Sequence, residues 1–149
     1  MDYSKFNKAF DVAALKNDVK EAAENGGNYK EVPKGQYEVK IDKMELTESK
    51  KGDPMVSVWF TIVSGEYEKS KIFMNQVITQ GFQIHIMNEF LRSLDSGCEI
   101  QFDDFEQYAQ LLMDVHEAID SQGLEFALEY GESKGFNTYK ITEVFESSN

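Results

Sequence analysis

The chain of 149 residues lacks what several classes of protein require. It has one cysteine, Cys98, so an internal disulfide and a cysteine-based zinc cage are excluded. No apolar run approaches the roughly 18 to 20 residues that a membrane-spanning helix needs. The N-terminus, Met1–Lys5, has no apolar core of a signal peptide, so we expect no export and a location in the cytoplasm.

Positive charge is scarce in the second half of the chain. The formal net charge is −12, from 27 acidic and 15 basic residues. Residues 72–149 contain only Arg92, Lys134 and Lys140 against 14 acids. This balance argues against a protein that binds the phosphates of double-stranded DNA mainly through positive surface charge, because such binding needs clustered lysine and arginine. The acidic half either keeps the protein soluble or leaves the other half of the surface available to an anion.

Catalytic motifs are also missing. Neither a phosphate-binding loop with its lysine nor a dinucleotide fingerprint occurs. His116 lies between acids in Asp114–Glu117, but neighbours on a helix point about 100° apart and do not converge. The acid pair Asp103–Asp104 is explained by helix capping. The sequence therefore predicts no catalytic residue, no metal site and no cofactor, and hence a protein that is not an enzyme.

What is present begins with an amphipathic segment. Phe10 and Leu15 have the spacing of a hydrophobic staple around Asp11, and an apolar stripe follows at intervals of three and four until Gly26. We expect residues 1–28 to form an N-terminal helix and linker, and residues 29–149 to form the main domain. The apolar stripe can pack on this domain or on a second copy of the chain, so a homo-oligomer stays open.

The rest of the chain predicts three strands, two helices and two strands. Alternation indicates strands over residues 37–46, 55–63 and 71–78, with a bulge near Lys43, and later over 124–130 and 136–145. Helical spacing covers 82–94 and 103–123, where Asp103 and Glu106 have the spacing of a capping box. This order predicts a β-rich α+β fold, an OB-like five-stranded antiparallel barrel with two helices between strands 3 and 4. An antiparallel α+β sheet with helices on one face fits the same pattern.

A barrel of this kind suggests where a ligand binds. The face of strands 2 and 3 and the loops 1–2 and 4–5 hold single strands by aromatic stacking and by cations along the backbone. Trp59 is expected on the face opposite Val58 and Phe60. The candidate nucleic-acid-binding residues are Lys50, Lys51, Lys69, Lys71, Lys134, Trp59, Phe73 and Phe136. The alternative is that these aromatics are core residues and that the lysines are ordinary turn residues.

Several strings in the chain resemble a known family. They are Val32–Val39, Lys50–Met55, Ile72–Gln76, Ile84–Leu91 and Gly135–Asn137. Together they resemble a phage-encoded family of unknown function from phages and prophages of Gram-positive bacteria, over about Phe10 to Phe145. The resemblance implies a role among replication and recombination genes as a single-stranded-DNA-binding accessory in the cytoplasm of the infected host. It implies no catalytic residues.

Three hypotheses follow. The first is a phage single-stranded-DNA-binding protein that acts in DNA replication or recombination, with single-stranded DNA and replication or recombination proteins as partners. The second is an acidic protein-interaction module, which binds a replication protein or inhibits a host nuclease. A metal-dependent nuclease is the third, and incubation of labelled strands with Mg²⁺ or Mn²⁺ would test it.

Overall fold

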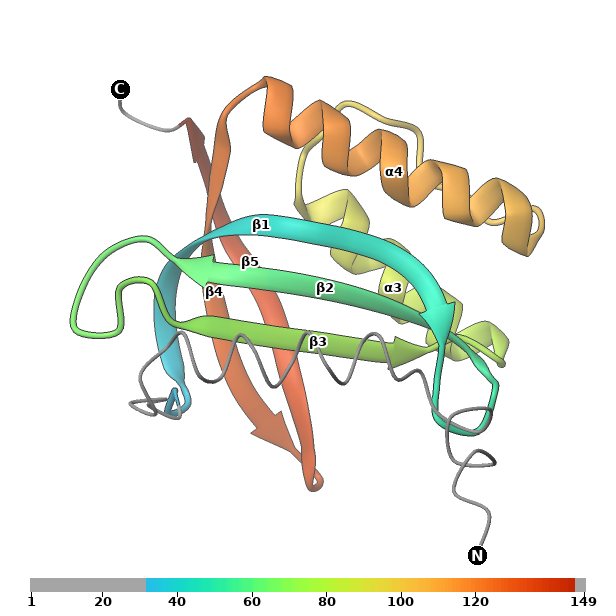
Figure 1. Ribbon diagram of the computed structural model, residues 1–149, viewed down its shortest axis with the longest axis horizontal. Helices are drawn as coiled ribbons and strands as arrows, with labels where there is room; N and C mark the ends of the chain where they lie inside the picture. Colours follow the sequence, from blue (N-terminus) through green and yellow to red (C-terminus); the bar gives the residue numbers. More distant parts are fainter. Residues whose placement is uncertain (1–31, 147–149) are drawn as a thin grey trace, which may run out of the picture. The chain divides into compact units, whose positions relative to one another are not determined.

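The computed structural model of the protein describes residues 32–146, and Figure 1 shows their arrangement. They form five strands and two helices in the order β1–β2–β3–α3–α4–β4–β5. The bounds are β1 Gly35–Glu48, β2 Pro54–Ile62, β3 Lys71–Val77, α3 Gly81–Ser93, α4 Phe105–Ser121, β4 Leu124–Ser133 and β5 Phe136–Glu146. The helix predicted within residues 1–28 lies outside the described residues.

The five strands form one antiparallel sheet in the order β3–β2–β1–β4–β5. β3 and β5 are the edges of this sheet, and no backbone ladder joins them in the described part of the chain. The sheet is therefore open, and the predicted OB-like closed barrel is wrong. The number of strands and the position of the two helices after the third strand match the sequence pattern. The alternative of an antiparallel α+β sheet describes the open sheet better.

Side chains fill the space between the two edges. A barrel closes only when strand tilt and stagger bring its edges together along their length. Here Tyr139 of β5 donates a hydrogen bond from its hydroxyl to the backbone carbonyl of Phe73 in β3, at 2.7 Å. Phe60 of β2 stacks on Tyr139 and makes an edge contact with Phe90 of α3. Because α3 packs against both edge strands, this part of the core is covered without a ladder between them.

β1 contains the predicted bulge. Ile41 pairs with Phe60 and Lys43 with Trp59, so Asp42 is the extra residue of β1. The bulge near Lys43 is thus confirmed. It inverts the alternation of the strand, because Val39 and Ile41 face the core before it and Met44 faces the core after it. As a result Lys43 lies on the solvent side, next to its register partner in β2.

The core lies between one face of the sheet and the helices. Val56, Val58, Phe60 and Ile62 of β2 are fully buried, as their alternation predicts. The helices contribute buried residues at intervals of three and four, which are Met87, Phe90 and Leu91 from α3 and Tyr108, Leu111, Leu112, Val115 and Ile119 from α4. Their packing leaves the opposite face of β1, β2 and β3 without a helical layer among the described elements, and we call this face the outer face.

The start of α4 differs from the sequence prediction by one residue. Its N-cap is Asp104, whose carboxylate accepts a hydrogen bond from the backbone N–H of Gln107 at 2.7 Å. The predicted pairing of Asp103 with Glu106 is wrong, because the extended backbone that a cap needs occurs at Asp104. Neither α3 nor α4 is long and apolar enough to cross a membrane.

Candidate nucleic-acid interface

Two aromatic rings form the centre of the outer face. Trp59 of β2 and Phe73 of β3 are direct partners in the register of the sheet. Their ring centroids are 5.4 Å apart and their planes meet at 89°, an edge-to-face contact. Phe73 is 40% exposed and Trp59 is half-buried. The structure therefore brings two of the predicted stacking residues together on the solvent side of the sheet.

A lysine covers one face of the Trp59 ring. The Nζ atom of Lys43 lies 4.5 Å from the ring centroid, within the range of a cation–π interaction. The same ammonium group lies 3.2 Å from a carboxylate oxygen of Glu45. Lys43 was not among the predicted site residues. The inverted alternation after the bulge was the signal that could have placed it beside Trp59.

Polar groups continue the outer face along β2 and β3. The indole Nε1–H of Trp59 donates to the hydroxyl of Ser57 at 3.1 Å, and this hydroxyl donates to Oδ1 of Asn75 at 2.9 Å. Ser57 is buried and Asn75 is exposed. Sequence reasoning missed both residues, since serine and asparagine on a strand carry no motif. Their alternation with Val56 and Met74 was the only available signal.

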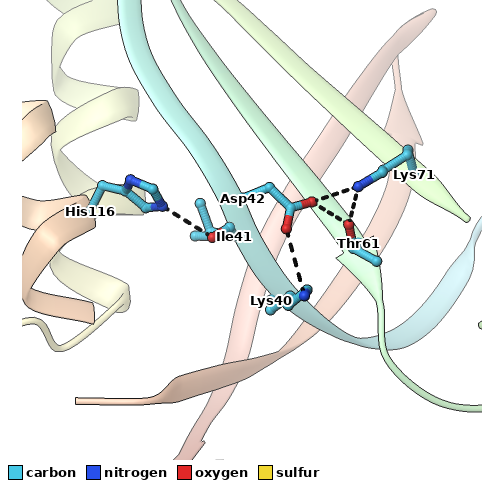
Figure 2. A network of polar contacts seen from close by, with 6 residues as sticks. All are labelled: Lys40, Ile41, Asp42, Thr61, Lys71 and His116. Carbon is cyan, nitrogen blue, oxygen red and sulfur yellow. Dashed lines mark hydrogen bonds and ion pairs between the residues drawn. The ribbon is translucent and has the colours of Figure 1, made fainter. Parts of the chain in front are cut away.

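A network of charged and polar groups lies beside Trp59 on the same face, and Figure 2 shows it. The Nζ atom of Lys71 donates to Oδ2 of Asp42 at 2.9 Å and to the hydroxyl of Thr61 at 2.6 Å. Thr61 in turn donates to Asp42. Lys40 lies 4.0 Å from the other oxygen of this carboxylate. The bulged residue thus holds two lysines on the outer face.

His116 takes part in a separate contact at the edge of this network. Its Nε2 atom lies 3.2 Å from the backbone carbonyl of Ile41 and links α4 to β1 (Figure 2). Within residues 32–146 no group of three or more His, Cys, Asp or Glu side chains is placed to hold a metal ion.

Lys50 and Lys51 lie at the tip of the loop between β1 and β2. The hydroxyl of Ser49 accepts hydrogen bonds from the backbone N–H groups of Lys51 and Asp53, which fixes the shape of the loop. Both lysine side chains are exposed. Glu48 and Asp53 flank them, so the local charge is close to balanced. These lysines reach solvent at one end of the outer face.

Lys69 and Lys71 lie toward the other end. Lys69 is exposed in the turn between β2 and β3, with a positive φ of 75°, and its N–H donates to the carbonyl of Ile62. Lys71 pairs with Thr61 at the far end of the β2–β3 ladder. The seven residue steps from Pro54 to Thr61 span about 23 Å. Predicted cations therefore lie at both ends of the outer face, with the aromatic pair between them.

Lys134 and Phe136 lie apart from this arrangement. β4 and β5 are joined by a two-residue turn, where Lys134 and Gly135 have φ of 53° and 83° as a type I′ turn requires. β4 therefore extends to Ser133, beyond the strand predicted over residues 124–130. Phe136 is 75% exposed and makes no ring contact with Trp59 or Phe73. In Figure 1 the tip of this hairpin lies below β3.

Charge is segregated between the two sides of the fold. The outer face carries three lysines, Lys40, Lys43 and Lys71, against three acids, Glu38, Asp42 and Glu45, so its charge is balanced. α4, on the other side of the sheet, exposes four acids and no base, and these acids are Glu106, Asp114, Glu117 and Asp120. An anionic ligand would therefore meet less repulsion on the outer face than on α4.

Comparison with known proteins gives the family of the chain. Residues 7–134 match the family described as "Protein of unknown function (DUF669)". No curated protein shows significant similarity to the chain. The match covers most of the sequence, including all of β1, β2, β3 and both helices. The protein therefore belongs to the DUF669 family of proteins of unknown function.

Proposed function

We propose that the protein binds single-stranded DNA through the outer face of β1, β2 and β3, as a non-catalytic component of phage DNA replication or recombination. The observation that supports this most strongly is the Trp59–Phe73 pair on a solvent-facing side of the sheet. Aromatic residues on strands are usually part of a core, and here the core lies on the opposite face. Every nucleobase has a π-face, so such rings suit a strand of any sequence.

The surrounding charges also suit a polynucleotide backbone. Lys43 and Lys71 lie beside the two rings, and both are paired with acids on the sheet surface. Surface ion pairs of this kind contribute about 0 to 1 kcal/mol, so phosphates can replace the acids as partners at low cost. Because the acids remain nearby, we expect binding of modest affinity that weakens strongly with salt.

The association with phages rests on the resemblance of the strings between Val32 and Asn137 to a family from phages and prophages of Gram-positive bacteria. The genes that encode this family lie among genes for replication and recombination. The cytoplasm of the infected host is the proposed location, and phage replication or recombination proteins are proposed as further partners.

Titration of a fluorescent oligothymidine of about 16 nucleotides tests the proposal, since single domains cover strands up to roughly this length. Anisotropy is measured at about 50 and about 200 mM salt, because each phosphate contact lowers the logarithm of affinity by about 0.7 per logarithm of salt for a single strand. Saturable binding that weakens with salt supports the proposal. Absence of binding at either salt rejects it.

A charge-matched pair of variants tests the position of the site. Lys50→Gln with Lys51→Gln removes two positive charges from the end of the outer face. His85→Glu with Met113→Glu changes the net charge by the same amount at exposed positions on α3 and α4. We expect the first variant to bind with a smaller salt slope and the second to bind as the wild type does. Equal weakening in both would show that only net charge matters.

A second candidate function, an acidic protein-interaction module, is favoured by a different observation. α3 and α4 expose large apolar side chains on the acidic side of the fold, namely Phe82 (61%), Ile86 (48%), Phe105 (44%) and Met113 (59%). Exposed apolar groups among charges are typical of protein contacts. Phe82→Ser with Ile86→Ser would abolish capture of a replication protein or nuclease from infected cells and would leave binding of oligothymidine intact.

A further inference from the structure

The hydrogen bonds of the outer face fix the orientation of one amide group. The indole N–H of Trp59 can only donate, so the hydroxyl oxygen of Ser57 is its acceptor. Ser57 is 6% exposed, and its own proton therefore needs an acceptor within the protein. Oδ1 of Asn75 lies 2.9 Å away and accepts it. This chain of donors requires that the carbonyl oxygen of Asn75 points toward Ser57.

The amide nitrogen of Asn75 is consequently available to a ligand. Asn75 is exposed, and within residues 32–146 its amide makes no other hydrogen bond. Both N–H donors of Nδ2 can thus meet solvent or a bound group, while Oδ1 is turned toward Ser57 and already accepts one hydrogen bond. The hydrogen bond from Ser57 holds Oδ1 toward β2, so the part of the amide that is left to meet a ligand carries the two donors of Nδ2.

This donor lies beside the aromatic pair. Phe73 and Asn75 are two residues apart on the same side of β3, about 6.7 Å along the strand. Ser57, the partner of Asn75 in the register, is two residues from Trp59 in β2. A base that stacks on Phe73 therefore has its polar edge near the amide donors of Asn75.

We infer that the outer face prefers thymine and uracil, which present a carbonyl oxygen at position 4, over cytosine, which presents an amino group there, and that Asn75 is the residue that determines this preference. The inference rests on the proposed binding of single strands. Asparagine usually recognises adenine by donating to N7 and accepting from the amino group at once. That bidentate contact is disfavoured here, because the hydrogen bond from Ser57 uses one lone pair of Oδ1 and holds this oxygen toward β2.

The chemical contrast is sharpest between thymine and 5-methylcytosine. The two bases share the ring, the methyl group and the carbonyl at position 2, and they differ at position 4. Thymine presents an oxygen acceptor there, whereas 5-methylcytosine presents an amino donor, which would oppose the donors of Asn75. Stacking area is nearly the same, so a difference in affinity reports the polar contact.

The test compares labelled strands of thymidine and of 5-methyldeoxycytidine in the same anisotropy assay. We expect the wild-type protein to bind the thymidine strand about threefold to tenfold more tightly, the range of one neutral hydrogen bond. Asn75→Ala should bring this ratio close to one. Asn75→Asp keeps an acceptor for Ser57 and replaces the donors by an acceptor, so it should reverse the preference.

The outcomes separate this inference from the proposed function. If no strand binds, the proposed function fails. If both strands bind with salt-dependent affinity and equal strength, or if the preference persists in Asn75→Ala, strand binding stands and the inference is overturned. Ser57→Ala provides a second route, because it releases the amide to rotate. Ser57→Ala should reduce the ratio of the affinities for the two strands. The thymidine strand should still bind, because Trp59 and Phe73 remain able to stack on bases.

Discussion

The hydroxyl of Tyr139 in β5 donates to the backbone carbonyl of Phe73 in β3, and this contact joins the two edges of the open sheet. It also connects the outer face to the core, since the ring of Tyr139 stacks on Phe60 and Tyr130. The position of Phe73 on the outer face therefore depends partly on a side chain of β5, the strand at the other edge of the sheet.

Tyr139→Phe tests this contact. Removing the hydroxyl keeps the stacked ring and deletes one neutral hydrogen bond, so we expect a loss of about 1 kcal/mol in the free energy of unfolding, measured by urea denaturation. Thr142→Val is the matched control, because its hydrogen bond to the carbonyl of Ala127 lies within the β4–β5 pair and not between edges. If Tyr139→Phe is as stable as the wild type, the contact between the edges contributes nothing.

Trp59 is the only tryptophan of the chain, so its fluorescence reports on the proposed site alone. We expect unlabelled oligothymidine to quench or shift this emission with the same midpoint as the anisotropy change. A base that stacks on Trp59 must displace Lys43 from the ring face or occupy the opposite one. Strand binding with unchanged emission would place the ligand elsewhere.

Phe73→Ala should weaken strand binding by about 1 to 3 kcal/mol, the typical contribution of one stacked base. Phe136→Ala serves as the comparison, because Phe136 is more exposed but lies at the tip of the β4–β5 hairpin. We expect a smaller loss of affinity for Phe136→Ala. The reverse order would move the stacking site from the outer face to the hairpin.

Asp42→Asn should increase affinity for single strands. This carboxylate holds Lys71 at 2.9 Å and Lys40 at 4.0 Å, and its neutralisation would free both ammonium groups for phosphates. The gain expected from such surface pairs is about 0.2 to 1 kcal/mol each, together with a steeper dependence on salt. Glu106→Gln, on the exposed surface of α4, has the same charge change and should have little effect. A decrease in affinity for Asp42→Asn would contradict the assignment of these lysines.

Stability should fall at alkaline pH. Burial raises the pKa of Tyr108 and of Tyr139 above the ordinary value of 10.0. As pH rises, the two phenol groups lose their protons at a lower pH in the unfolded chain than in the folded protein. The free energy of unfolding is therefore unaffected below pH 10 and declines as pH rises above it. Urea denaturation at about pH 8 and about pH 11 measures this decline. Tyr108→Phe should lower stability at pH 8 and flatten the decline, and an equally steep decline would refute this origin.

Local alternation made much of the sheet predictable. The alternation of β2 correctly placed Val58 and Phe60 in the core and Trp59 on the other side, because a strand with one buried face has a period of two. The closure of the sheet was not predictable in this way. It depends on whether β3 and β5 meet along their length, and here a tyrosine side chain and α3 occupy that space.

The candidate site was predictable in its aromatic centre and less so around it. The alternation of the strands predicts that Trp59 and Phe73 lie on the outer face. The face of Lys43 can be predicted only when the position of the bulge is known to within one residue. The Ser57–Asn75 hydrogen bond depends on the register between two strands, which a single sequence specifies weakly. Lys134 and Phe136 were grouped with the site because a closed barrel would have brought the β4–β5 loop toward it.

The bulge at Asp42 also limits which changes of length β1 tolerates. The two halves of the strand present opposite parities to the core, so deletion of Asp42 would shift one half by one residue relative to the other. Such a shift would turn Lys43 toward the core and Met44 toward solvent. A deletion or insertion of one residue in the loop that carries Lys50 and Lys51 avoids this problem, because it leaves the whole of β1 unchanged.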